Sequence, residues 1–166
     1  MKKALAIGLP VVLLLVALVL LLPYNTELQQ ETQVMCYSPT DRFVNRDYTV
    51  SVEGKLVNNP VLKDKLKAEV TLKQVGYHTI YEVDEAYTTL GEAYDDQDIH
   101  MVYGQSEAMN TCVFFFNEDL SLFLLYDSNK EGNTYITAEE ESDFIDFYNF
   151  CATQTDGILP VLDVED

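Results

Sequence analysis

The 166-residue sequence has no tryptophan, three cysteines and two histidines. Cys36, Cys112 and Cys151 form no Cys-x-x-Cys pair, which excludes the usual thiol-redox and zinc-binding motifs. No glycine-rich phosphate-binding loop occurs, and neither His78 nor His100 lies in a known catalytic pattern. The sequence therefore predicts a protein that is not an enzyme, although a site dispersed through the fold stays open as an alternative. The cysteines are interpreted either as one disulfide of undetermined pairing or as small core residues.

Basic residues are also scarce, with 10 lysines and arginines against 28 aspartates and glutamates, a net charge of −18. Two of the ten are Lys2 and Lys3, so residues 24–166 carry eight basic and 28 acidic residues, a net charge of −20. Such a surface repels phosphate backbones, and we expect no nucleic-acid partner. The simplest interpretation of the charge is solubility, with a cation or a basic partner as the alternative.

One long apolar run stands out against this background, the nineteen uncharged residues from Ala4 to Leu22. A helix of this length is roughly 28 Å long, close to the thickness of the hydrocarbon layer of a bilayer. Lys2 and Lys3 precede the run, whereas the flank after Pro23 carries acids and no base, which predicts a cytoplasmic N-terminus. We expect residues 1–23 to be a single-pass signal anchor, with the rest of the chain outside the cytoplasm.

A cleaved signal peptide is the alternative interpretation of the apolar run. Its apolar region would span ~7–15 residues and end at a small-x-small cleavage site, whereas this run ends Leu-Leu-Leu-Pro-Tyr. Both interpretations place the following residues outside the cytoplasm. No Asn-x-Ser/Thr glycosylation acceptor follows the run, and the Met-Lys-Lys start is similar to bacterial export signals, so we expect a bacterial cell envelope.

Strand signals begin after a polar stretch, residues 24–45, that we interpret as a stalk. Apolar and polar residues alternate over 48–57 and over 66–72, and residues 79–83 are the expected hairpin partner of the second run. The runs from Thr111 to Phe116 and from Leu120 to Tyr126 are apolar on both faces, which predicts central strands covered on both sides. The acidic segment from Glu85 to Asp98 is interpreted as a solvated loop.

A helix is predicted near the C-terminus. Phe144, Phe147, Tyr148 and Cys151 form one apolar stripe at helical spacing. The segment from Thr137 to Glu140 matches a capping box, in which threonine and glutamate side chains bind free amides at a helix start. We expect this helix to end near residue 152 and the acidic tail, residues 153–166, to be loose.

The expected fold class is therefore α+β: a mostly antiparallel sheet of about five to seven strands with one late amphipathic helix packed on it, preceded by the transmembrane helix. The expected divisions are the anchor (1–23), the stalk (24–45), an extracytoplasmic domain (46–152) and the tail (153–166). A two-sheet sandwich is the rival, because one helix covers only one face of the doubly apolar strands.

Oxygen-bearing side chains cluster between residues 127 and 140 in a pattern similar to a calcium loop, with Gly132 at the sixth position. The pattern departs from that loop because Ala138 occupies the position of its terminal glutamate and a strand leads into it. A polar hairpin turn explains the same residues. The weak candidate metal ligands are Asp127, Asn129, Glu131, Asn133 and Glu140.

These patterns lead to three function hypotheses. The first is a membrane-tethered extracytoplasmic interaction or structural module without catalytic activity, which contacts the membrane through Ala4 to Leu22 and a protein partner in the envelope. The second is a domain that binds calcium weakly. The third is an enzyme with a dispersed site, for which the sequence points to no catalytic residue and no cofactor.

Overall fold

The computed structural model describes residues 21–39, 42–43, 48–128 and 132–162. The predicted anchor, Ala4 to Leu22, lies outside these ranges except for Leu21 and Leu22. Within the described ranges, no helix has the length and hydropathy needed to span a bilayer. The anchor therefore stays a prediction.

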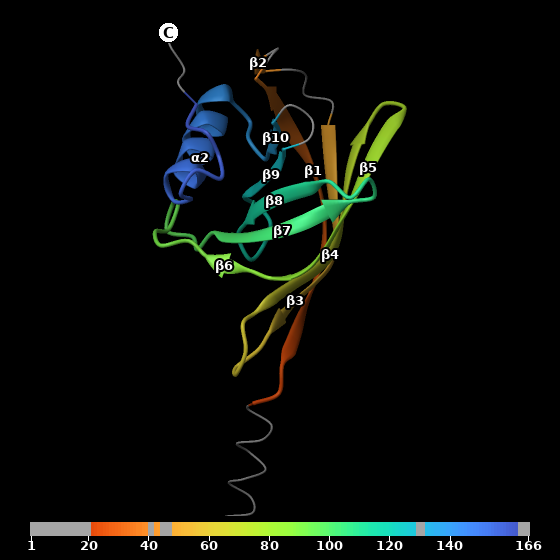
Figure 1. The fold of residues 1–166 in the computed structure, drawn as a ribbon, viewed down its shortest axis with the longest axis vertical. Coiled ribbons are helices and arrows are strands. Elements are labelled where there is room, and N and C mark those ends of the chain that lie inside the picture. Colours follow the sequence, from red (N-terminus) through yellow and green to blue (C-terminus); the bar gives the residue numbers. More distant parts are fainter. Residues whose placement is uncertain (1–20, 40–41, 44–47, 129–131, 163–166) are drawn as a thin grey trace, which may run out of the picture.

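The described chain is rich in strands and contains one α-helix, α2 (Glu141–Thr153). The first five strands are β1 (Tyr24–Ser38), β2 (Arg42–Phe43), β3 (Tyr48–Asn58), β4 (Lys65–Gln74) and β5 (Tyr77–Ala86). The remaining strands are β6 (Thr88–Thr89), β7 (His100–Ser106), β8 (Thr111–Phe116), β9 (Phe123–Asp127) and β10 (Asn133–Ile136). Figure 1 shows their arrangement, with α2 packed on one side of the strands.

Eight of these strands form a closed antiparallel barrel in the order β1-β3-β4-β5-β7-β8-β9-β10. The 15-residue strand β1 closes it, because residues 24–34 pair with β3 and residues 35–37 pair with β10. The short strands β2 and β6 attach to β1 and β7. The predicted fold class, a sheet of five to seven strands with a helix packed on it, was therefore wrong. Alternation of apolar and polar residues predicts where strands lie. It does not predict that one strand pairs with two different strands along its length, as β1 does.

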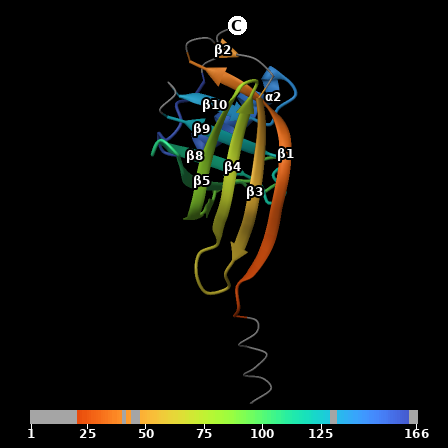
Figure 2. The same cartoon turned by 90° about the vertical axis from the view of Figure 1, so that its right-hand side faces the viewer.

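The predicted stalk is the second correction, because residues 24–38 form β1. Leu28 is the one buried side chain among its first ten residues, so the sequence shows no period-two pattern there. Backbone pairing with β3 over eleven consecutive residues holds this polar strand in place. The sheet of β1, β3, β4 and β5 extends beyond the rest of the barrel toward the start of β1 (Figure 2).

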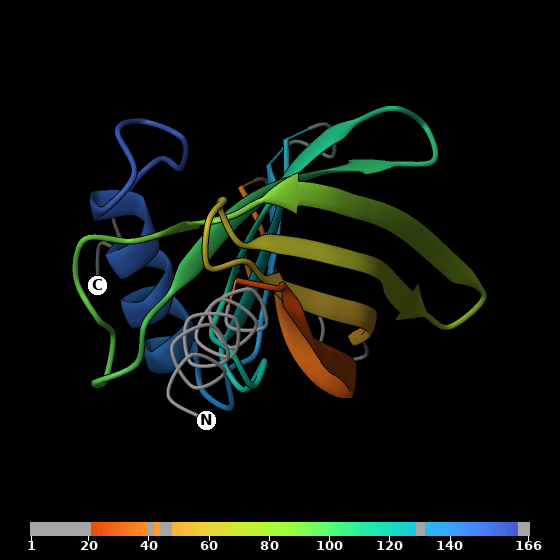
Figure 3. The ribbon, with the colours of Figure 1, turned by 90° about the horizontal axis from the view of Figure 1, so that it is seen from below.

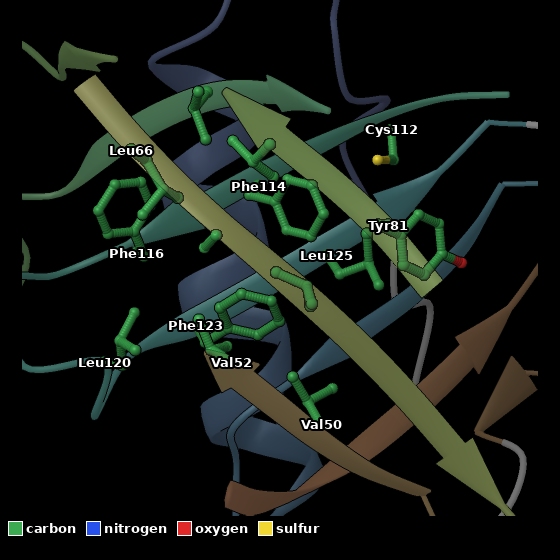
Figure 4. Close-up of a cluster of buried hydrophobic side chains, with 14 of the residues drawn as sticks. Val50, Val52, Leu66, Tyr81, Cys112, Phe114, Phe116, Leu120, Phe123 and Leu125 are labelled. Carbon is green, nitrogen blue, oxygen red and sulfur yellow. The ribbon is translucent and has the colours of Figure 1, made fainter. Parts of the chain in front are cut away.

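The barrel interior is filled by apolar side chains from both halves of the ring. Val50, Val52 and Leu66 from the long strands face Phe114 and other aromatic side chains of the shorter strands, as Figure 4 shows. Burying such side chains contributes roughly 1.5–3 kcal/mol each, which makes this cluster the main source of stability. The interior is thus a packed core.

A second core lies between the outer face of the short strands and α2. Phe115 and Leu124 point outward from β8 and β9 and pack with Phe144, Phe147 and Cys151 of the helix. The prediction that the two doubly apolar strands are covered on both faces is confirmed. The helix covers one face, and the long strands of the same barrel cover the other.

The apolar stripe of α2 is confirmed, but the predicted capping box is wrong. Thr137 Oγ1 accepts a hydrogen bond from the Phe123 amide at 2.9 Å, and the N-cap residue Glu140 makes no side-chain capping bond. The tail is also better held than expected up to residue 162. Leu159 is buried, and the Asn149 side chain bonds both the amide and the carbonyl of Leu162.

Candidate functional site

The candidate metal ligand Asp127 faces the barrel interior. It is the last residue of β9, its side chain is buried, and it accepts a hydrogen bond from the Tyr81 hydroxyl at 2.9 Å. In the strand register it lies opposite Cys112 on one side and Asn133 on the other. Its carboxyl group therefore belongs to a buried polar cluster with Tyr81 and does not project into the turn that follows β9.

Of the other candidate ligands in the described chain, Asn133 lies opposite Asp127 in the strand register, whereas Glu140 lies beyond the other end of the hairpin. Ile136 pairs with Leu124 at the end of the β9–β10 hairpin that is away from the turn. Glu140 lies four residues beyond Ile136, directly before α2, and is exposed. Asn129 and Glu131 lie outside the described residues. In the part of the chain that the structure describes, no group of three or more histidine, cysteine, aspartate or glutamate side chains is arranged to hold a metal ion.

The buried thiols are held in their protonated form. Burial, with the nearby Asp127 carboxyl group adding to it, raises the pKa of the Cys112 thiol to about 12. Burial likewise raises the pKa of Cys151, which lies in the core between α2 and the barrel. A thiol is a nucleophile only as the thiolate, so these two cysteines are inert at neutral pH. All three cysteines occupy the apolar cores, Cys36 with Cys112 inside the barrel.

The two histidines lie in different surroundings. His78 is exposed on β5, opposite Lys73. His100 is buried at the start of β7 between the rings of Tyr87 and Phe116, and its Nδ1 lies 3.0 Å from the Thr89 hydroxyl oxygen. Burial lowers the pKa of His100 against the raising effect of nearby carboxylates, chiefly that of Glu118. A neutral, aromatic-packed imidazole suits a structural role.

Among the seams of the described barrel, the one between β5 and β7 has the fewest paired residues. Only two residue pairs join these strands, Tyr81 with Ser106 and Glu82 with Gln105. Continuing that register would pair Asp84 with Tyr103, but in the described chain no ladder pair joins residues 83–86 to residues 102–104. Pairing with β7 resumes only at Thr88 in β6, with a shift of two residues.

Backbone groups of β5 and β7 face one another across this opening. The Glu107 amide donates to the Ile80 carbonyl, so the even-numbered residues of β5 direct their N–H and C=O groups toward β7. By the same alternation, the backbone groups of Asp84 and Ala86 point into the opening, as do those of Tyr103 from the other side. Viewed from below, the tips of the β7–β8 and β4–β5 hairpins diverge on the other side of the two paired residues from this opening (Figure 3).

A groove of about 850 Å³ lies over the opening. Its rim is acidic and carries two exposed apolar side chains, Tyr103 and Met109. Gly104 forms part of its floor, where a Cβ atom would lie 2.6 Å from the Phe114 ring and 3.0 Å from the Val83 side chain. The groove is lined by Glu82, Asp84, Glu85, Ala86, Tyr103, Gly104, Gln105, Ser106, Glu107, Met109 and Thr111.

Sequence reasoning missed this groove. The acids at 82, 84 and 85 suggested a solvated surface, and the strand over residues 100–106 was not predicted. The interrupted pairing has no sequence signal beyond Gly104, which fits a close approach of two strands. Comparison of the chain with protein-family models, with curated proteins and with solved structures found no match. The geometry of the groove is therefore the basis for a functional proposal.

Proposed function

We propose that this protein is a membrane-tethered, non-catalytic binding module that captures an extended, basic segment of an envelope protein in the groove between β5 and β7. The observation that carries the proposal is the interrupted seam, where Asp84, Ala86 and Tyr103 direct backbone groups into an open groove. The tether is the apolar segment from Ala4 to Leu22, with the barrel outside the cytoplasm.

Strand addition is the binding mode that fits this geometry. An extended peptide gains affinity from main-chain hydrogen bonds to an unpaired strand and specificity from pockets for alternate side chains. Residues 83–86 border the groove without a ladder pair to β7, and they pair with β4 on their other side. Tyr103 and Met109 supply exposed apolar surface for the side chains of the peptide.

The charge around the groove favours a basic peptide. Glu82, Glu85 and Glu107 are exposed along its rim, and no lysine or arginine lines it. Residues 74–166 contain 21 acidic residues and a single basic one, Lys130. Complementary charge speeds the encounter with a basic partner and disfavours acidic ones.

The buried titratable groups support a role without catalysis. Asp127 is bonded to Tyr81 inside the packed barrel, and the Cys112 and Cys151 thiols are kept protonated by burial. None of these residues lines the groove. The groove itself presents carboxylates, a phenol and main-chain groups, which suit recognition.

The test is binding of a fluorescein-labelled ten-residue peptide of alternating lysine and valine to the full-length protein, measured by fluorescence anisotropy. We expect saturable binding, and much weaker binding of the matched peptide in which glutamate replaces lysine. Asp84→Pro removes the side-chain carboxylate and one N–H, and that N–H faces the groove, because the amides that bond β4 belong to the odd-numbered residues of β5.

Asp84→Ala is the matched control, because it removes the same carboxylate and its surface ion pair with Lys67 but keeps the N–H. We expect Asp84→Pro to weaken binding roughly tenfold more than Asp84→Ala, the effect of one main-chain hydrogen bond and the contacts that depend on it. Equal affinity of the two variants would contradict strand addition. Equal binding of the lysine and glutamate peptides would contradict the choice of a basic partner.

A further inference from the structure

The turn between β3 and β4, residues 59–64, lies at the same end of the molecule as the start of β1. Tyr24, the first residue of β1, pairs with Asn58, the last residue of β3. The turn is therefore adjacent to residues 21–23, where the apolar N-terminal segment of the sequence ends. Figures 1 and 2 show this end as the far tip of the long sheet.

Exposed apolar side chains gather at this tip. Leu62 is 72% exposed, Val61 is 65% exposed and Tyr24 is 63% exposed, and Leu21 and Leu22 are exposed beside them. The other large exposed apolar side chains of the described residues are spread over three separate places: the β4–β5 turn, the groove between β5 and β7, and the end of the tail. An apolar patch in a protein this acidic marks a contact surface.

The turn holds these side chains in a defined position. The Asn59 side-chain oxygen accepts hydrogen bonds from the amides of Val61, at 3.1 Å, and Leu62, at 3.0 Å. The Asp64 carboxylate in turn accepts a hydrogen bond from the Asn59 amide at 2.6 Å. Val61 and Leu62 are thus presented at the tip of an ordered turn, with two exposed lysines, Lys63 and Lys65, directly after them.

We propose that this turn is a second membrane contact, in which Val61 and Leu62 insert into the interfacial layer of a phospholipid bilayer. Tyr24 would lie at the level of the headgroups, where tyrosine is enriched, and the two lysines would reach lipid phosphates. The inference rests on the proposed tether, because a membrane-spanning segment that ends before Tyr24 would bring this tip to the bilayer surface. The barrel then stands on the membrane in a fixed orientation.

The test uses the absence of tryptophan from the sequence. Leu62→Trp places a single fluorophore at the tip, and Val75→Trp places one at the β4–β5 turn, where Val75 is 93% exposed. Both full-length variants are reconstituted into nanodiscs of phosphatidylcholine and phosphatidylglycerol, with and without brominated acyl chains. We expect the emission of Leu62→Trp to shift to shorter wavelength by about 10 nm or more and to be quenched by the bromolipids, and that of Val75→Trp to be unaffected.

Two outcomes would overturn the inference, and they can be told apart. If the protein remains with the nanodiscs but the two tryptophans behave alike, the tether stands and the membrane contact of the turn is wrong. If the full-length protein does not remain with the nanodiscs, the tether and the contact are both wrong.

Discussion

The hydrogen bond from Tyr81 to Asp127 can be removed by a substitution that deletes a single hydroxyl group. Both side chains are buried, and the bond joins β5 to β9 across the interior at 2.9 Å. Tyr81→Phe keeps the ring, including its edge-to-face contact with Phe114, and removes only the hydroxyl group. The substitution therefore isolates the polar contact from the packing.

A hydrogen bond to a charged group contributes about 1.5–3 kcal/mol, and leaving a buried acceptor without its donor costs a similar amount. Asp127 has further interactions, which limit the loss. We expect Tyr81→Phe to lower the free energy of unfolding by about 2 kcal/mol. That is a large share of the roughly 5–15 kcal/mol typical of a domain.

The assay is urea denaturation of the full-length protein in detergent micelles, followed by circular dichroism. The midpoint should fall while the m-value stays constant, since the compactness of neither state changes. Tyr103→Phe is the matched control, because this tyrosine is exposed on β7, and it should change stability by less than about 0.5 kcal/mol. A double-mutant cycle with Asp127→Asn should give a coupling energy above about 1 kcal/mol. Additive effects would refute the assignment of the loss to this bond.

Three further predictions concern packing, alkaline pH and the helix. Gly104→Ala should destabilise the protein by about 1–3 kcal/mol in the same denaturation assay, because the new Cβ would lie 2.6 Å from an aromatic ring. Gly91→Ala is the control, because its Cβ would meet only one ordinary contact at 3.5 Å, and it should be nearly neutral. Because the pKa of Cys112 is raised from 9.0 to about 12, its contribution to stability is present below pH 9 and lost progressively up to pH 12. Denaturation midpoints measured from pH 8 to pH 11 should therefore fall less steeply for Cys112→Ala, and an unchanged slope would contradict this. Phe147→Asp buries a charge against the barrel and should lower the free energy of unfolding by several kcal/mol, measured by thermal unfolding. Asp146→Lys changes an exposed residue of the same helix and should leave stability unchanged. Equal tolerance of both substitutions would mean that the apolar stripe faces no core.

The strands that alternate apolar and polar residues could be predicted from the sequence. Residues 48–57 and 66–72 lie in β3 and β4, and the doubly apolar runs became β8 and β9. The late helix followed in the same way from its stripe, because burial against a core imposes a period on the residues. Where one face of a strand or helix is buried, the spacing of its apolar residues predicts the type of element and the face that it buries.

The closure of the barrel and the identity of β1 could not be predicted, for one physical reason. Residues 24–33 are held by main-chain hydrogen bonds to β3, and those bonds place almost no demand on side chains. Polar residues exposed on both faces of a strand have the same composition as a linker. The change of partner from β3 to β10 at Met35 is likewise a property of the backbone.

The environment of Asp127 could not be predicted from the sequence, for a related reason. Asp127 was grouped with the turn residues that follow it because they are neighbours in sequence, yet its side chain belongs to the interior with Tyr81. A strand directs successive side chains to opposite faces, so an aspartate at the end of a strand can belong to the core or to the turn. The groove between β5 and β7 could not be predicted from the sequence, because it depends on backbone pairs that do not form between segments about twenty residues apart.

The distribution of charge along the chain connects the two proposed contacts. Residues 42–73 contain seven basic and four acidic residues, whereas residues 74–166 contain one basic and 21 acidic residues. The mildly basic region of the sequence therefore carries the β3–β4 turn, and the strongly acidic region carries the rim of the groove. An anionic bilayer attracts the first region and repels the second, within the ~8 Å screening length of physiological salt. Under the two proposals, this charge pattern favours lipid at the tip and a basic partner at the groove, and the two contacts adjoin where Ala86 pairs with Lys65.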